Sequence, residues 1–198
     1  NPVGGLLVEG NLVEEEFYSF VGLFPTPYFH GMTIGELALL FNDEFGIDCD
    51  LTVVPMLGWK RDMYWDDTGL SWVPTSPHVP HWETILYMGA SGTFGELGTL
   101  SEGVGYTSPF ETIGAPWINA EEFASELNAL NLPGIYFRPL SFKPYYFRNK
   151  DKDLQGVQMH ITDRNVFLPY ATGLYIMQTH IQMYPEHDLF ANKNRINM

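Results

Sequence analysis

NAEEFASELNALNLPGIYFR, running from Asn119 to Arg138, holds the signals for a helix, its end and the start of a strand. Asn119 is a typical N-cap residue, and Glu122 three positions later completes a capping box. Apolar residues then recur at helical spacing. They predict a buried face of Ala120, Phe123, Ala124, Leu127 and Leu130. Leu132-Pro-Gly134 ends the helix, and Ile135 and Phe137 alternate with polar neighbours as in a strand.

Outward from this stretch, helical and strand patterns are mixed. Thr33-Ile-Gly-Glu36 is a second capping box, and Gly46 ends the helix that it begins. The apolar stripe of that helix is Ile34, Leu37, Ala38, Phe41 and Phe45. Further helices are expected at 81–94 and 169–184, strands at 51–54 and 157–162, and a long loop at 55–81. We therefore predict an α/β (mixed α+β) fold in a single domain, 1–198.

Composition limits the classes of function. With 198 residues and 45% hydrophobic content, the chain can bury one substantial core. A net charge of −14 argues against a nucleic-acid partner, because phosphate binding needs clustered Lys and Arg. The apolar runs are too short to predict a membrane span, and Cys49 is the only cysteine, so no internal disulfide can form. Because the chain opens on Asn1-Pro2, we interpret it as a mature or excised piece.

The segment from Trp59 to Trp82 is rich in aromatic residues set among hydrogen-bonding groups. The aromatic residues are Trp59, Tyr64, Trp65, Trp72 and Trp82, and the polar ones are Arg61, Asp66, Asp67, Ser76 and His78. Indole faces and fixed polar groups together suit a sugar, whose C–H face packs on the ring. The alternative is that the aromatic side chains only pin a long loop to the body.

Histidines supply further candidates. His160 alternates with Val157, Met159 and Ile161, so it is expected on the polar face of its strand, either in a cleft or as a structural residue. His30 precedes the Thr33 capping box, and the helix N-terminus there lowers an imidazole pKa. His78 and His81 are close in sequence, but Pro80 between them excludes a regular helix, so we expect no metal site.

Glu102 and Glu111 are candidates for the two carboxyl groups of a hydrolytic site. Glycosidases place two carboxyl groups about 5–10 Å apart across the scissile bond. Nine positions separate these residues, and on one regular strand that spacing sends them to opposite faces. If the chain cleaves sugars, we therefore expect one carboxylate to come from elsewhere.

Ordered blocks along nearly the whole chain carry a family resemblance. They are Asn1-Pro-Val-Gly-Gly5, Val8-Glu-Gly10, Ser19-Phe-Val-Gly22, His30-Gly-Met-Thr-Ile-Gly-Glu-Leu37, Gly58-Trp-Lys-Arg61, Asp67-Thr-Gly-Leu70, Trp72-Val-Pro-Thr-Ser-Pro77, Ser101-Glu-Gly103, Pro109-Phe-Glu111, Gly114-Ala-Pro-Trp117, Leu132-Pro-Gly134, Phe137-Arg-Pro139, Gly156-Val-Gln158 and Thr162-Asp-Arg164. On these blocks the sequence resembles the bacterial exo-β-N-acetylmuramidases (NamZ-type), which hydrolyse N-acetylmuramic acid from the non-reducing ends of peptidoglycan fragments.

The resemblance also implies a longer protein. Family members begin with a Rossmann-like domain whose Pro-Glu-His-Gly motif supplies the favoured catalytic acid. The resemblance puts that domain before Asn1 and more chain after Met198, so this sequence is expected to be the substrate-side part. Pro185-Glu-His-Asp188 lies where the family has no such motif, and we do not assign it that role. The implied location is extracytoplasmic, either periplasmic or secreted.

One departure concerns the sugar. Many family members have Arg at the positions of Val104 and Ser108, and a lactyl carboxylate favours a guanidinium partner. Arg61, Arg138 or Arg164 could replace them, or the sugar could be another N-acetylhexosamine.

These arguments lead to a definite hypothesis about the site. The expected catalytic or cleft residues are Glu102, Tyr87, His30 and His160, and the expected substrate contacts are Trp59, Arg61, Ser76, His78, Tyr106 and Arg164. No metal or cofactor is expected, and the expected partners are a peptidoglycan-derived sugar or muropeptide and the N-terminal domain. The alternative function is a non-catalytic carbohydrate-binding or scaffold domain of the same fold.

Overall fold

The structure is a computed structural model that describes residues 3 and 5–191, so Asn1, Pro2 and Gly4 of the first family block lie outside the described residues. Its helices and strands confirm the mixed α/β class. The chain divides into two compact units, Asn1–Val73 and Pro74–Met198. The sequence did not predict a boundary between residues 73 and 74. Each unit is described by itself below.

Unit 1 (Asn1–Val73) contains a small antiparallel pair, β1 (Val8–Glu9) with β2 (Phe29–His30), and the helix α1 (Ile34–Glu44). Two 3-10 turns, Glu15–Phe17 and Asp66–Thr68, complete it. The predicted capping box is present at α1, where Thr33 accepts from the Glu36 N–H and the Glu36 side chain accepts from the Thr33 N–H.

Two expectations for unit 1 are wrong. Phe41 and Phe45 do pack with Phe24, with ring centroids 4.7 and 4.2 Å from it, but Ile34 at the head of the predicted stripe is 84% exposed. The segment 51–54 forms no strand in the structure. A strand exists through its ladder to a neighbour, and a short apolar run does not itself supply one.

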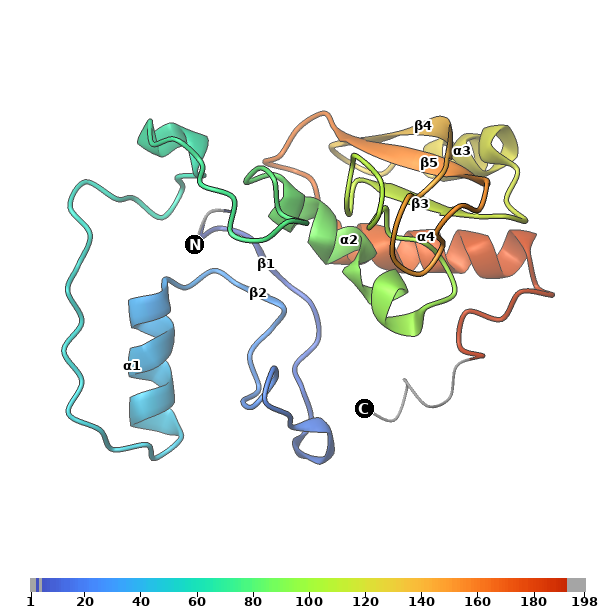
Figure 1. Ribbon diagram of the computed structural model, residues 1–198. Helices are drawn as coiled ribbons and strands as arrows, with labels where there is room; N and C mark the ends of the chain where they lie inside the picture. Colours follow the sequence, from blue (N-terminus) through green and yellow to red (C-terminus); the bar gives the residue numbers. More distant parts are fainter. Residues whose placement is uncertain (1–2, 4, 192–198) are drawn as a thin grey trace. The chain divides into compact units, whose positions relative to one another are not determined.

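Unit 2 (Pro74–Met198) holds a three-stranded antiparallel sheet in the order β3-β5-β4, with three helices (Figure 1). In chain order the elements are α2 (Thr84–Leu97), β3 (Thr112–Ala115), α3 (Ala120–Ala129), β4 (Ile135–Phe142), β5 (Leu154–Ile161) and α4 (Pro169–Met183). The predictions for all of these except β3 are confirmed within a few residues. β3 was missed because it is short and buried on both faces, so it shows no alternation.

The α3–β4 stretch forms largely as predicted. Asn119 caps α3, accepting from the Glu121 and Glu122 N–H groups. The backbone N–H of Asn119 donates to the Tyr184 hydroxyl at 3.0 Å. In the predicted capping box the Glu122 side chain would accept from this N–H, so the Tyr184 hydroxyl takes the place of Glu122. Leu130 was expected to be buried but is 41% exposed, because it lies at the C-cap beyond the last helical turn.

The core of unit 2 lies between the sheet and the helices. Its fully buried side chains include Phe94, Leu100, Ile113, Phe123, Leu127, Phe137, Val157, Met159 and Ile176. Gly156 in the central strand has no room for a side chain, because an added Cβ would lie 1.9 Å from the Ile113 carbonyl oxygen. No helix among the described residues is both long enough and apolar enough to cross a membrane.

Candidate active site

Glu102 is the buried carboxyl group of unit 2. It is 6% exposed and its side chain lies against Gly95 of α2, where an added Cβ would come within 2.8 Å of the Glu102 Cδ. Burial raises the pKa of Glu102, and the positive charges of Arg148 and His78 oppose that rise. Glu102 is therefore a carboxyl group whose protonated form is favoured by its surroundings, with cations close by.

The loop carrying Glu102 is closed on itself. Ser101 pairs with Gly114 as an isolated bridge, and the Phe110 N–H donates to the Glu102 carbonyl oxygen at 2.7 Å. Gly103, at φ +80°, lies so close to Thr112 and Ser108 that an added Cβ would be 2.3 Å from the Thr112 Oγ1. These contacts fix the backbone around Glu102.

A second loop, 143–153 between β4 and β5, packs onto the first. The Tyr145 N–H donates to the Gly105 carbonyl oxygen at 2.8 Å, and an added Cβ on Gly105 would lie 2.2 Å from the Tyr146 carbonyl oxygen. From this loop the Arg148 guanidinium donates to the Gly95 carbonyl oxygen, next to Glu102. The Tyr146 hydroxyl is 2.6 Å from the His78 Nε2, and the two rings are stacked.

A separate polar cluster lies at the start of α2. His81 Nε2 is 2.8 Å from a carboxylate oxygen of Glu111, and His81 Nδ1 is 3.3 Å from Glu83. Tyr87 belongs to the same region, because the charges of Glu111 and Glu83 add to the burial that raises its pKa, and its hydroxyl accepts from the Ile161 N–H at 3.4 Å. This cluster joins α2, the loop before β3 and the end of β5.

Glu102 and Glu111 thus have different partners. The positive charge of Arg148 acts on Glu102, whereas the Glu111 carboxylate is paired with His81. The expectation that the two residues do not act together as a hydrolytic pair stays a prediction.

His160 lies on β5 opposite Tyr136, half-buried, while its neighbours Val157 and Met159 are fully buried. It is therefore outside the apolar core, on the strand face that the alternation predicted. Among the described residues its Nε2 is buried and has no hydrogen-bond partner.

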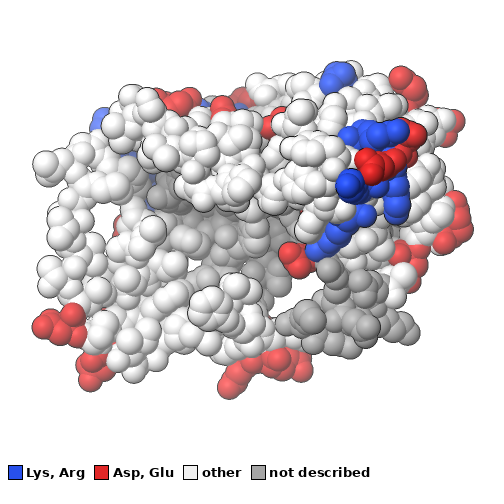
Figure 2. Space-filling view, in the orientation of Figure 1, with Lys and Arg blue, Asp and Glu red and all other residues white. Residues whose placement is uncertain are grey.

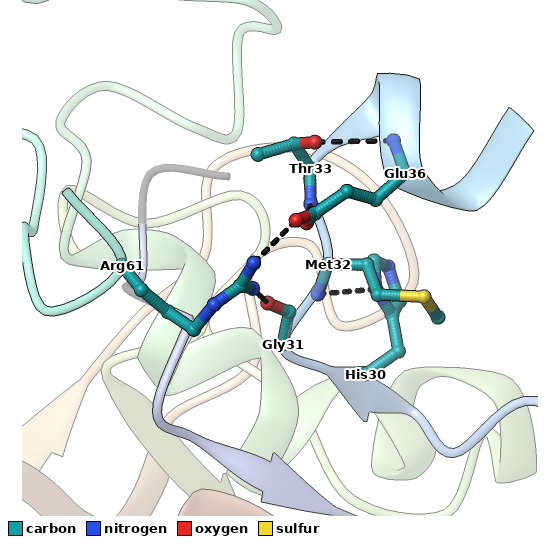
Figure 3. Close-up of polar contacts among 6 residues, drawn as sticks. All are labelled: His30, Gly31, Met32, Thr33, Glu36 and Arg61. Atoms are coloured by element: carbon teal, nitrogen blue, oxygen red, sulfur yellow. Dashed lines mark hydrogen bonds and ion pairs between the residues drawn. The ribbon is translucent and has the colours of Figure 1, made fainter. Parts of the chain in front are cut away.

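In unit 1, His30 lines a cavity of about 560 Å³. Its Nδ1 accepts from the Met32 N–H at 3.1 Å (Figure 3), so the neutral ring carries its proton on Nε2. The pKa of His30 is lowered, as expected, but the main cause is burial and not the helix N-terminus. The same cavity is lined by Tyr28, whose pKa burial raises.

Arg61 is engaged within unit 1 (Figure 3). Its guanidinium donates to the Gly31 carbonyl oxygen at 2.7 Å and pairs with the Glu36 carboxylate, and it lies 5.3 Å from the Trp59 ring centre. The Arg61 hydrogen bond is also the largest cause of the lowered pKa of Glu36. The Arg61 guanidinium is therefore held within unit 1 by Gly31 and Glu36.

The tryptophan residues of the segment from Trp59 to Trp82 lie in both units. Trp59, Trp65 and Trp72 belong to unit 1, whereas Trp82 is a buried residue of unit 2 with the Arg164 guanidinium 5.5 Å from its ring centre. Trp65 and Trp72 pack edge to face at 5.2 Å. The Trp segment therefore does not belong to one unit, and Trp82 matches the alternative that these rings are structural.

Three other expected residues lie in unit 2. Ser76 accepts from the His78 N–H at 3.3 Å and so helps to place that ring. Tyr106 packs on Phe142, with ring centres 5.2 Å apart, and lines a cavity of about 610 Å³ at the end of the sheet. Arg138, named as a possible carboxylate partner, donates to the Gln158 side-chain oxygen across β4 and β5.

Sequence reasoning missed Arg148, Tyr146 and Gly95. A usable signal was present, because Lys143-Pro-Tyr-Tyr-Phe-Arg-Asn-Lys-Asp-Lys152 holds four of the ten Lys and Arg residues of an acidic chain. Among residues 3 and 5–191, no group of three His, Cys, Asp or Glu side chains is arranged to hold a metal ion.

Comparison with known proteins identifies the family of the chain. Residues 85–198 match the family described as exo-β-N-acetylmuramidase NamZ, C-terminal, and residues 1–83 match its N-terminal counterpart. The chain belongs to the exo-β-N-acetylmuramidase NamZ family. It is 50% identical over 186 residues to a protein of Bacillus subtilis (strain 168) named peptidoglycan β-N-acetylmuramidase NamZ, covering 94% of this chain and 45% of that protein.

Two solved structures of DUF1343 family proteins from Bacteroides fragilis NCTC 9343 are similar. One shares 48% identity and a TM-score of 0.96, covering all of this chain (100%) and 53% of that one. The other, with 24% identity and a TM-score of 0.56, covers 99% of this chain and 55% of that one, and supports the fold alone. The chain thus spans about half the length of the relatives that it matches.

Proposed function

We propose that this chain is the substrate-side part of a peptidoglycan glycosidase that releases N-acetylmuramic acid, or a related N-acetylhexosamine, from non-reducing ends. The family membership supports the reaction class. The observation that carries the proposal for this chain is the buried Glu102 with its raised pKa beside Arg148 and His78.

Glu102 would act as one of the two carboxyl groups that glycoside hydrolysis uses. A carboxyl group whose pKa is raised by burial is suited to donate a proton to the leaving oxygen. The Gly95 contact and the closed 101–111 loop would hold it in position. His78, held by Tyr146 and Ser76, is placed to bond sugar hydroxyls around it.

The second carboxyl group would come from outside this chain. Glu111 is paired with His81, and the chain spans about half of its relatives. We therefore expect the 198 residues alone to show no turnover, with hydrolysis requiring the part of the family that they do not match.

The test uses the chain alone and a chimera in which it replaces the matching segment of the B. subtilis relative. Both are assayed on a chromogenic N-acetylmuramide, with circular dichroism to establish folding and the unaltered relative as the positive control. The proposal expects turnover by the chimera and none by the chain.

Clear turnover by the chain alone would show that it is self-sufficient. A folded but silent chimera would favour the alternative, a non-catalytic carbohydrate-binding domain of the same fold. We also propose an extracytoplasmic location, because peptidoglycan lies there, and cell fractionation with an antibody to the chain tests it.

A further inference from the structure

The connection between β4 and β5 concentrates positive charge in an acidic protein. The chain carries 10 Lys and Arg against 24 Asp and Glu, yet residues 143–153, here called the basic loop, hold Lys143, Arg148, Lys150 and Lys152 against only Asp151 and Asp153. Figure 2 shows Lys and Arg gathered with a few acidic side chains in the region of this connection. An anion approaching the molecule would meet a local attraction here.

The cavity at the end of the sheet opens beside this loop. It measures about 610 Å³, within the range of about 300–1,000 Å³ for small-molecule sites. Its lining is Tyr106, Pro116, Ser141, Phe142, Lys143, Asp153, Leu154 and Gln155. The lining thus combines aromatic and prolyl rings with a hydroxyl, an amide, an ammonium group and the carboxylate of Asp153, a mixture of apolar faces and polar groups that suits a sugar.

The polar groups of this cavity are held in place. Ser141 and Gln155 are register partners on β4 and β5, so their side chains lie on the same face of the sheet. The Gln155 side-chain oxygen accepts from the Ala120 N–H at 3.3 Å. This bond orients the Gln155 amide, so that its NH2 group points away from the Ala120 N–H. Tyr106 is fixed through its ring contact with Phe142.

Lys143 is the cation of the cavity. Its Nζ is 2.9 Å from an Asp153 carboxylate oxygen, and the side chains are 53% and 88% exposed. An ammonium group has three donors, so one bond to Asp153 orients the group and leaves donors for a ligand. Arg61 is likewise paired with a carboxylate, that of Glu36, and Arg138 donates to Gln158, but neither arginine lines this cavity.

We propose that this cavity binds the carboxylate-bearing amino sugar of the substrate, with Lys143 of the basic loop holding the carboxylate and Tyr106 packing against the ring. The identity of the sugar rests on the proposed function, whereas the site itself rests on the cavity and the charges. Lys143 is then a specificity-determining residue that selects a lactyl-bearing N-acetylhexosamine over a neutral one.

Binding to the chain itself tests this, without any hydrolysis. The matched probes are N-acetylmuramic acid and N-acetylglucosamine, which differ in the lactyl group, measured by NMR titration of the ¹⁵N-labelled chain. The lactyl carboxylate should make the first sugar bind about twofold to fivefold more tightly, because ion pairs at exposed positions contribute little. The shifted amides should include those of Tyr106, Lys143 and Gln155, and added salt should weaken the preference.

Three variants test whether Lys143 causes the preference for the charged sugar. Lys143→Gln should abolish the preference, and Asp153→Asn should increase it by removing the competing carboxylate. Lys60→Gln, in unit 1, makes the same change in net charge and should leave the preference unaltered. Equal affinity for the two sugars, equal competition by acetate, or a preference that Lys143→Gln leaves intact would each overturn the proposal. Because no turnover is measured, none of these outcomes is confused with failure of the glycosidase assay.

Discussion

The carboxyl group of Glu102 rests on Gly95, at a point where a single methyl group would come within 2.8 Å of the Glu102 Cδ. Gly95 lies within α2, and an Arg148 donor occupies its carbonyl oxygen. Helix α2, the 101–111 loop and the basic loop therefore meet at Gly95, which has no side chain. Packing of this kind tolerates little added volume.

Gly95→Ala is expected to destabilise the chain by about 1–3 kcal/mol, because Glu102 must move to admit the methyl group. The measurement is urea unfolding. Gly92→Ala is the matched control in the same helix, since its added Cβ would lie 3.4 Å from a flexible Met88 side chain. That variant should be neutral or more stable by up to about 1 kcal/mol, because Ala favours a helix over Gly. Equal effects at both positions would show that Glu102 is not confined by Gly95.

His180 should make the fold sensitive to acid. It is fully buried, and burial is the main cause that lowers its pKa from 6.5 to about 4. Its Nε2 accepts from the Trp117 Nε1 at 3.2 Å, so the neutral ring is the folded form. Between pH 6.5 and about 4, His180 binds a proton in the unfolded chain but stays neutral in the folded chain. The folded state therefore loses stability as the pH falls through this window, and the full stability is present above it.

The expected loss from His180 is on the order of 3 kcal/mol, and His180→Gln should remove it. The measurement is denaturant unfolding of wild type and variant at several pH values from about 7 to about 4, which covers the window between the two pKa values. Glu186 and His187 also act on His180, so the difference between the two proteins isolates the ring. Parallel pH profiles would contradict the assignment.

Asn128 ties α3 to β4 with two hydrogen bonds, donating to the Phe137 carbonyl oxygen at 2.8 Å and accepting from its N–H at 3.0 Å. Asn128→Ala leaves both backbone groups without their partner, and we expect a loss of about 2–3 kcal/mol in unfolding free energy. Ser125→Ala, at an exposed position of the same helix, should change stability by less than about 0.5 kcal/mol. A loss for Asn128→Ala as small as that control would show that water replaces the two bonds.

The ion pair of His81 with Glu111 can be weighed by a double-mutant cycle of His81→Gln and Glu111→Gln. Because His81 is 44% exposed and Glu111 15%, the coupling should be about 0.5–1 kcal/mol. Thermal unfolding of the four proteins measures it. A coupling near zero would mean that the two side chains are close without stabilising each other.

The sequence predicted most of unit 2, and the reason is local. Asn119 and the spacing of Phe123 and Leu127 identify α3, and alternation identifies β4 and β5. Where no local rule applies the prediction was wrong: 51–54 has strand composition but no strand partner, and β3 lacks alternation. Tertiary contacts decide such short segments.

The candidate site was only partly predictable for a similar reason. Glu102 was expected among the catalytic or cleft residues, yet its surroundings are set by tertiary contacts. Arg148 lies in the β4–β5 connection and Gly95 in α2, and no spacing rule links either residue to Glu102. The charge density of residues 143–152 was visible in the sequence, but its contact with the 101–111 loop needed the structure.

The central claim is that Glu102 is a working carboxyl group of the glycosidase. The direct measurement is kcat/KM of the chimera on a chromogenic N-acetylmuramide, with Glu102→Gln compared with Glu126→Gln, an isosteric change at an exposed position of α3. If Glu102 donates a proton, its loss should lower kcat/KM by about 100-fold to 10,000-fold, with folding retained and Glu126→Gln unchanged. Activity of Glu102→Gln within a factor of about two of the unaltered chimera would contradict the account, because a general acid cannot be replaced by an amide without loss.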